Sequence, residues 1–428
     1  MTGSRPNLLM HNPATMTEVL ERLLQKPEDN SFSSVREQAS LLIKEKGLPD
    51  KKNEEYKYTP ISRILEKSFA NYTGNKQSQL DVLRTKIPGL SMAQMVFVNG
   101  QFSEELSHCP CPIGMEVSTL EDKNYSASVE ANADEYALLN ASNLNGGTII
   151  TFKKGAVIEP LIAIVHITDS SKNQAVAYPR VVIRAEENAQ ASVVELFTGY
   201  GDAASFTNAV TEISCANRSM LTYIKIGNEN DNQLHVGNTN VDVAGNAVFT
   251  SITANFGGQM VRNNLRIALH ESYSEAHLFG LYMPDNKEHI DNHTVVDHQM
   301  PNCESNELYK GILNGSSTGV FNGKIFVQQD AQKTNAFQSN KNILLSDNAA
   351  INTKPQLEIW ADDVKCSHGC TTGKLDNEQL FYLKSRGIDE SSAKVLLVTA
   401  FANEVLEQIK DEKVRVYVQN LLHKKIEG

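Results

Sequence analysis

The sequence predicts a mainly β protein in which a parallel β-helix, or solenoid, forms the core between N-terminal and C-terminal helical segments. Short strand-like runs recur at nearly constant spacing through the middle of the chain, whereas helical periodicity is confined to the two ends. The strand-like pattern ends in the stretch Pro355–Gly373 and a helical pattern follows it. We therefore expect a helical or mixed region at residues 1–145, the β-helix core at 146–373 and a C-terminal helical domain at 374–428.

The strand-like runs form two series, and both recur with a period of roughly 26–29 residues, the size that stacked structural repeats commonly have. One series is Val181–Ala185, Ala209–Ser214, Asn238–Val243 and Asn264–Leu269, and the other begins at Ala191, Met220, Val248 and Glu275. A constant period in a β-rich sequence indicates stacked coils, each burying its apolar face on its neighbours. A β-sandwich also contains short strands, but the even spacing favours a solenoid. After Asn302 the features that mark the start of each strand-like run lie closer together, near Ser317, Lys333 and Ala349. We therefore expect shorter coils there.

Helices are expected at both ends of the chain. Near the N-terminus, Ser34 and Glu37 form a capping-box pattern. The apolar face of this helix would be Val35, Ala39, Leu42 and Ile43, with Gly47 and Pro49 ending it. After the junction, Asp376 and Asp389 would cap two helices and a third would follow.

The C-terminal helices have apolar stripes that need a partner surface. In the second helix the stripe would comprise Ala393, Leu396, Leu397, Ala400, Val405 and Ile409, and in the third Val414, Tyr417, Val418, Leu421 and Leu422. Open ends of a solenoid expose unpaired strand edges. We therefore expect these helices to dock on the solenoid end or on a partner protein.

Composition and charge argue against several classes of protein. The net charge of −11 and the pI near 5.5 disfavour nucleic acid as the main partner, because no basic block offsets the acidic balance. No run of about 18 apolar residues occurs, so we expect no membrane span. The stretch Met1–Ala14 lacks the apolar segment of a secretory signal, and six cysteines do not suggest a disulfide scaffold. We therefore expect a cytoplasmic protein with reduced thiols.

Three candidate ligands lie at the junction. Cys366, His368 and Cys370 alternate along a predicted strand, so their side chains would point to the same side. Thiolates and imidazole suit iron, sulfide or persulfide. The alternative, which spacing alone favours, is three small polar residues at a strand end. A closed structural zinc site needs four ligands, so a site here would be shared with another subunit.

A second cluster contains His289, Asp291, His293, Asp297, His298 and Cys303. A mononuclear metal site is conceivable, but polar side chains on the outer face of the coil turns are the favoured interpretation. Cys109 and Cys111 lack the C-x-x-C spacing of redox or zinc motifs, so an exposed loop is expected. The run from Gly315 to Lys324 is not a nucleotide-binding loop, because Thr318 and Ile325 stand where the motif requires Gly and Ser or Thr.

Several segments resemble the SufB/SufD family, the paralogous subunits of the SUF iron–sulfur cluster assembly machinery. They are Asn53–Pro60, Leu313–Ile325, Gln338–Ser346, Pro355–Ile359, Asp363–Gly369 and Gln379–Ile388. The resemblance is to the SufD branch, because the run Cys366–Gly373 is SufD-like. In addition, Asn340 stands where the SufB branch is expected to carry a scaffold cysteine.

The resemblance implies a β-helix core, a SufB–SufD heterodimer joined through the two β-helices, and a SufC ATPase partner. His368 and Cys366 would contribute to handling iron or a transient iron–sulfur cluster at the heterodimer interface, whereas Cys370 stands where many members of the family have alanine. The chain would be a non-catalytic subunit, with ATP hydrolysis belonging to SufC. The residues expected to contact SufC are Leu380, Phe381, Leu383, Leu396, Leu397 and Phe401. The isolated chain could pair with a second copy, and binding of reduced flavin to the complex is left open.

Two other functions compete with this interpretation. A purely architectural subunit would stabilise SufB and recruit SufC without contributing ligands. A polysaccharide-acting β-helix enzyme would be expected to carry an export signal and aromatic sugar platforms. The chain has a single tryptophan, Trp360, so the enzyme is disfavoured.

Overall fold

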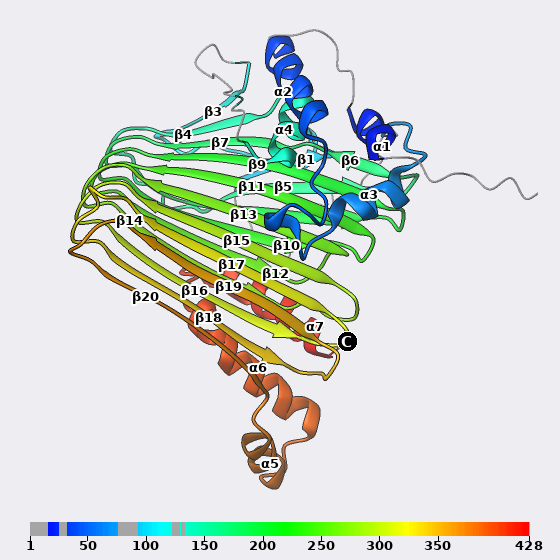
Figure 1. Ribbon diagram of the computed structural model, residues 1–428, viewed down its shortest axis with the longest axis vertical. Coiled ribbons are helices and arrows are strands. Elements are labelled where there is room, and N and C mark those ends of the chain that lie inside the picture. The colour runs from blue at the N-terminus through cyan, green and yellow to red at the C-terminus, as the bar shows by residue number, and fades with distance from the viewer. Residues whose placement is uncertain (1–15, 25–31, 76–92, 122–128, 130–132, 428) are drawn as a thin grey trace, which may run out of the picture.

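The computed structural model describes residues 16–24, 32–75, 93–121, 129 and 133–427. Its main body is a solenoid whose strands alternate between two sheets, which we call sheet A and sheet B (Figure 1). Sheet A contains β2 (Gln101–Phe102), β1 (Ala93–Val98), β5 (Ile162–Asp169), β8 (Gln190–Tyr200), β10 (Met220–Asn228), β12 (Val248–Asn255), β14 (Glu275–Tyr282), β16 (Glu304–Leu313), β18 (Asn335–Leu344) and β20 (Lys365–Lys374).

Sheet B contains β19 (Ala350–Ile359), β17 (Thr318–Val327), β15 (His289–His298), β13 (Met260–Leu269), β11 (Gln233–Val243), β9 (Ser205–Cys215), β7 (Arg180–Ala185), β4 (Thr148–Phe152) and β3 (Met115–Thr119), with β6 (Ala175–Ala177) beside β9. The two pairs at the N-terminal end, β1–β2 and β3–β4, are antiparallel, and the strands of the coils pair in parallel. The prediction of a parallel β-helix is therefore confirmed.

The coil spacing predicted from the sequence agrees with the observed register. Asn238 pairs with Asn264, and Val248 pairs with Glu275, so the repeats of each series stack directly on one another. The expectation of shorter coils after Asn302 is wrong, because Thr318 pairs with Ala350, a longer step along the chain than that from Asn238 to Asn264. The closer markers correspond to successive strands of opposite sheets, so each of them advances the chain by half a coil.

One corner of the solenoid uses a residue with a left-handed backbone in coil after coil. These residues are Asn188, Arg218, Asn246, Tyr273, Asn302 and Lys333, with φ between 56° and 64°. Backbone hydrogen bonds link consecutive corners, for example from Asn188 N to Asn217 O at 3.1 Å. Asparagine tolerates this conformation better than most residues. The polar clusters between the predicted strands are therefore the corners of the coils.

The solenoid interior is mainly apolar. Residues such as Ile183, Ile213, Val241, Phe249 and Ile267 come from both sheets and form one continuous buried cluster. These side chains alternate along each strand with residues that face outward, as the pleat of a strand requires. Burial of the alternating apolar residues between the two sheets therefore stabilises the stack of coils.

Helices cover the outer faces of both sheets (Figure 1). On sheet B lie α1 (Met16–Leu23), α2 (Ser33–Lys46), α3 (Ile61–Phe69) and α4 (Glu135–Ser142), together with the 3₁₀ turn η1 (Glu54–Tyr56). On sheet A lie α6 (Glu390–Leu406) and α7 (Glu412–Glu427), whereas α5 (Asn377–Ser385) projects from the body. Within the described ranges, none of these helices combines the length and the apolar character that a membrane span requires.

The predicted helix boundaries are correct in part. Asp376 and Asp389 cap α5 and α6 as expected, each accepting hydrogen bonds from backbone N–H groups. The capping box at Ser34 is wrong, because α2 begins at Ser33 after Phe32, which makes no side-chain cap. In α6 the buried face is Ala393, Val398, Ala402, Val405 and Leu406, and Leu396 of the predicted stripe is 51% exposed.

Some expectations fall outside the described residues. They include the stretch 1–14 and part of the segment from Gln77 onward, for which the sequence predicts mixed structure.

Candidate site at the open end of the solenoid

The last coil ends in two strand edges. β20 pairs with β18 and β19 pairs with β17, and within the described chain neither strand has a partner on its other side. Most residues of β20 are exposed and most of β19 are half-buried. Each edge presents unpaired backbone N–H and C=O groups, which are a ready template for another strand. The open end of the solenoid is therefore suited to pairing with another chain.

Cys366, His368 and Cys370 lie together at this open end. They pair in register with Ala336, Gln338 and Asn340 of β18, which are all buried in the interior. Cys366 packs against the buried cluster that includes Ala336. The three residues therefore share the interior-facing side of β20, as predicted from their alternation.

Strand β19 lies opposite β20 at the open end of the solenoid, and we call the space between these two strands the mouth. The Cys370 Sγ atom lies 2.9 Å from Thr353 Oγ1 of β19, and Thr353 belongs to the other sheet. His368 stands between the two cysteines along β20 and is exposed. Burial raises the pKa of the Cys366 thiol above its ordinary value, and a metal ion or cation nearby would favour its thiolate form. The mouth thus presents an imidazole flanked by two thiols.

These three donors do not form a closed metal site. Alternate residues of a strand are about 6.6 Å apart, whereas ligands of one metal ion lie about 2.0–2.3 Å from it. Among the residues that the structure describes, no three His, Cys, Asp or Glu side chains converge closely enough to hold a metal ion. A metal at His368 would therefore take its remaining ligands from outside the described residues.

Polar groups continue from the mouth into the interior. Gln338 Nε2 donates a hydrogen bond to Glu307 Oε2 at 2.7 Å, and both side chains are buried. Burial raises the pKa of Glu307 to about 7. The two residues belong to the same interior column as His368, because Glu307 pairs with Gln338 and Gln338 pairs with His368.

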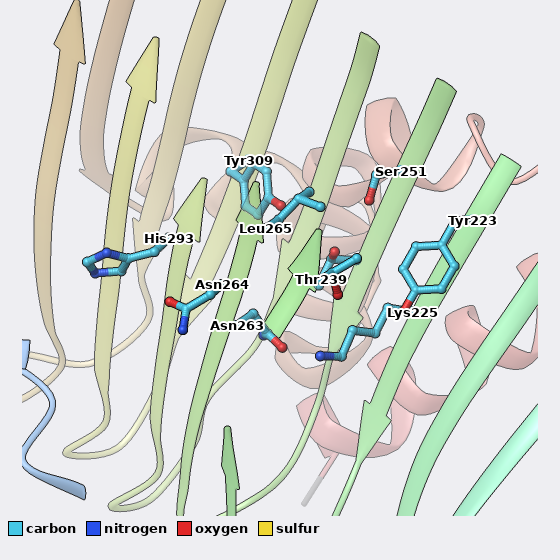
Figure 2. A pocket seen from close by; sticks show the side chains of 10 residues that line it. Tyr223, Lys225, Thr239, Ser251, Asn263, Asn264, Leu265, His293 and Tyr309 are labelled. Atoms are coloured by element: carbon cyan, nitrogen blue, oxygen red, sulfur yellow. The ribbon is translucent and has the colours of Figure 1, made fainter. Parts of the chain in front are cut away.

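Deeper in the solenoid is a small cavity with room for about one water molecule. It is lined by Tyr223, Lys225, Thr239, Ser251, Asn263 and Tyr309, among others. Figure 2 shows Lys225 extending towards Asn263, with Thr239 beside it. Burial lowers the pKa of Lys225 to about 8, and its Nζ atom lies 5.0 Å from the centre of the Phe197 ring.

The second cluster predicted from the sequence does not form a single site. His289, Asp291 and His293 lie on the outer face of sheet B beneath the segment Asn53–Thr59, which we call the N-terminal clasp. His298 and Cys303 instead contact interior residues, with His298 Nε2 2.8 Å from Ser305 Oγ. The favoured interpretation, polar side chains on the outer face of coil turns, is right about the outward direction of His289, Asp291 and His293, but these residues lie in strand β15 and not in a turn. It is wrong for His298 and Cys303, which face the interior.

The N-terminal clasp contacts four consecutive strands of sheet B. Arg262 Nη1 of β13 donates to the Glu55 carbonyl oxygen at 2.7 Å, and its guanidinium lies 4.4 Å from the centre of the Tyr56 ring. Glu55 also pairs with His293 of β15 at 3.5 Å and with Lys324 of β17 at 2.5 Å. The His293 ring, followed by Lys324, lowers the pKa of Glu55 to about 2.

The fourth contact of the clasp is at the last strand of sheet B, where Glu54 pairs with Lys354 of β19 at 2.6 Å. Beneath the clasp, Arg262 Nη1 lies 2.7 Å from Asp291 Oδ2, and both side chains are buried. Although burial acts to raise it, Arg262 and His293 hold the pKa of Asp291 well below its ordinary value. The histidines of this cluster therefore attach the N-terminal segment to the sheet.

The remaining motifs have structural roles. Cys109 and Cys111 lie in a loop with their sulfur atoms 4.0 Å apart, and Cys111 is exposed. Gly315 has φ of 63° in a coil corner, and Gly319 lies in β17. A nucleotide-binding loop would require irregular backbone here, whereas the chain continues as strand β17.

The C-terminal helices present an exposed apolar surface. No residue of α5 is buried, and Phe381 and Tyr382 are 74% and 56% exposed. Phe401 of α6 is instead engaged with sheet A, because Lys310 Nζ donates to its carbonyl oxygen at 2.7 Å and lies 4.7 Å from its ring centre. Of the residues expected to meet a partner, Phe381 and Leu396 are the most exposed, and the others are Leu380, Leu383, Leu397 and Phe401.

Comparison with known proteins finds relatives over most of the chain. The family model for the SUF system FeS cluster assembly SufBD core domain matches residues 166–401, and the model for the SufBD protein N-terminal region matches residues 16–159. The chain is 34% identical to the iron–sulfur cluster assembly protein SufD of Escherichia coli over 385 residues, which cover 89% of this chain and 90% of that protein.

Two further relatives are SufBD family proteins of Synechocystis sp. and Mycobacterium tuberculosis. The first is 28% identical over 410 residues, covering 91% of this chain and 90% of the relative. The second is 33% identical over 292 residues, covering 66% and 72%.

Proposed function

Because the chain belongs to the SufBD family of SUF iron–sulfur cluster assembly proteins, we propose that it is a SufD-like subunit that pairs with a SufB-like partner. The pairing would occur at the open end of the solenoid, where β19 and β20 present two unpaired strand edges. A partner strand added to such an edge gains backbone hydrogen bonds along its whole length. This feature carries the proposal, because a solvent-facing edge of this length otherwise promotes aggregation.

The candidate ligands support a shared assembly site at this interface. His368 and Cys366 supply an imidazole and a thiol at the mouth, and their spacing leaves room for donors from the partner. Iron and sulfide, the substrates of cluster assembly, would be bound by both subunits together. Cys370 lies two residues further along the same face and would be an additional donor.

A SufC-like ATPase is the second proposed partner. The exposed apolar residues Phe381 and Leu396 provide its contact surface, and Leu380, Leu383, Leu397 and Phe401 would complete it. Helix α5 begins three residues after β20 ends. A movement of α5 driven by ATP binding would therefore act directly on the strand that carries His368, while ATP hydrolysis stays with the ATPase.

The test is anaerobic co-purification of the chain with SufB-like and SufC-like subunits, followed by reconstitution with iron and sulfide and visible absorption of the bound cluster. We expect His368→Ala to leave the complex intact and to reduce cluster formation. Ser367→Ala is the matched control, because Ser367 alternates with His368 and faces the other side of β20.

Two outcomes would contradict the proposal. Equal cluster yield from the His368→Ala and Ser367→Ala complexes would leave the chain as an architectural subunit without ligands. Failure of the chain to bind either partner would contradict the whole assignment of its role.

A further inference from the structure

The side chain of Gln338 lies immediately behind His368 in the interior column of sheet A. The two residues are register partners in neighbouring parallel strands, β18 and β20, and their side chains face the same side. Adjacent strands are about 4.8 Å apart. Such neighbours are within hydrogen-bonding reach when one of them is a long amide and the other an imidazole.

The amide of Gln338 is held in one orientation from the inside. Its Nε2 atom donates to Glu307 Oε2 at 2.7 Å, and Glu307 is the register partner of Gln338 on β16. Gly323 of β17 provides the space for this amide, because a Cβ atom at Gly323 would overlap Gln338 Nε2. The pair is 3% and 1% exposed for Gln338 and Glu307, so the arrangement is built into the packed interior.

The oxygen of the same amide, Gln338 Oε1, is a hydrogen-bond acceptor without a donor in the described part of the chain. The atom itself is buried. An amide oxygen can only accept, and a buried acceptor without a donor is unfavourable. Since Glu307 occupies the nitrogen end, a ring N–H of His368 is the donor that this column offers.

We propose that Gln338, oriented by Glu307, is a positioning residue that accepts a hydrogen bond from one ring N–H of His368 and leaves the second ring nitrogen free to bind a metal ion. Metal-binding histidines commonly fix their tautomer in this way, through a hydrogen bond from the nitrogen that does not bind the metal. The metal-binding half of this inference rests on the proposed function, whereas the hydrogen bond itself does not.

Glu307 serves as an anchor whether or not it carries a proton. A carboxylate accepts from Gln338 Nε2, and a protonated carboxyl group accepts through its carbonyl oxygen. Because burial raises the pKa of Glu307 to about 7, both forms are present near neutral pH. The orientation of Gln338 should therefore be retained across this range, and so should the tautomer of His368.

The experiment is nitrogen NMR of the full chain labelled with ¹⁵N in histidine, recorded at a pH where His368 is neutral. The His368 signals are those that disappear in His368→Ala. A hydrogen bond of the usual net strength biases the two tautomers about fivefold. We expect Gln338→Leu to remove this bias and shift the two ring-nitrogen signals of His368 towards each other, while Glu307→Gln, which keeps an acceptor for Gln338, retains it.

The matched control is Gln356→Leu on β19. The Gln356 side chain is half-buried and lies on the outer face of the last coil, because its register partner Lys324 reaches the clasp on that face. Gln338→Met provides a second apolar variant if the leucine disturbs folding. Unchanged His368 signals in both folded Gln338 variants, or an equal change in Gln356→Leu, would overturn the inference. This measurement uses the chain without partners, so it is independent of the cluster-formation test that decides the proposed function.

Discussion

The clearest energetic prediction concerns Glu307, whose carboxyl group is buried in the solenoid interior. Its pKa is about 7 in the folded chain against an ordinary value of 4.5, and burial is the main cause. The folded protein therefore holds this proton more tightly than the unfolded chain. A group whose pKa is higher in the folded than in the unfolded chain increases the free energy of unfolding at low pH. This contribution is lost as the pH rises through the folded pKa.

The magnitude follows from the two pKa values. Between pH 5.5 and pH 8, Glu307 alone should reduce the free energy of unfolding by about 2 kcal/mol. Glu307→Gln keeps the shape of the side chain and cannot ionise. Over the same pH interval, the free energy of unfolding of this variant should therefore rise by about 2 kcal/mol relative to that of the unchanged protein.

Equilibrium urea unfolding followed by circular dichroism at several pH values measures this difference. Comparison with the unchanged protein at each pH cancels the titration of all other groups. Glu304→Gln is the matched control, because Glu304 lies on the same strand and is exposed, and its difference should stay flat. If the Glu307→Gln difference also stays flat within about 0.5 kcal/mol, Glu307 titrates like a solvated carboxyl group and burial does not raise its pKa.

Three further predictions follow from the packing. Asp291→Ala leaves Arg262 buried without its carboxylate. It should therefore lower the free energy of unfolding, measured with urea, by about 3–5 kcal/mol. A loss no larger than that of an exposed-site control would show that this buried ion pair contributes little to stability. Leu422→Ala removes a fully buried side chain between α7 and sheet A. It should lower the free energy of unfolding by about 2–5 kcal/mol in the same assay. A loss within the error of measurement would mean that α7 is not docked in solution. Phe381→Ala should leave the free energy of unfolding unchanged, because this residue is 74% exposed. It should weaken the binding of a SufC-like subunit, measured by calorimetry, at least about fivefold. Equal affinity would exclude α5 from that interface.

Much of the fold could be predicted because it depends on local and periodic features. The coil period is readable because successive coils from Asn188 to Lys333 repeat a polar corner with a left-handed residue. Asp376 and Asp389 were identifiable as caps because a cap acts over only three residues. The family assignment from the motif segments is confirmed by the family models and by the relative from Escherichia coli.

The errors came where packing decides between equivalent patterns. In α6 the sequence offers apolar residues on more than one side, and contact with sheet A selected Val398 and Ala402 rather than Leu396. Shorter late coils are predicted only if the strand starts of both sheets belong to one series, whereas Ser317 and Ala349 precede strands of sheet B and Lys333 precedes a strand of sheet A. Neither choice could be made without knowing which surfaces meet.

The sequence predicts the face of β20 that carries the candidate ligands, but it does not predict the residues that surround them. Alternation along β20 placed Cys366, His368 and Cys370 on one face, and the register with buried residues of β18 agrees with this. Gln338 and Glu307 were missed because their relation to His368 depends on register across three strands. The N-terminal clasp was missed for a similar reason, although it falls within the segment Asn53–Pro60 that resembles the family.

The clasp also sets an order of events during synthesis. Glu54 and its partner Lys354 are 300 residues apart, and a ribosome adding about 5–20 residues per second needs on the order of 15–60 s to make the chain between them. Through that interval the clasp segment has left the ribosome while its last contact strands have not yet been made. Closure of the clasp over β15, β17 and β19 therefore marks a chain whose solenoid has been wound to its final coil.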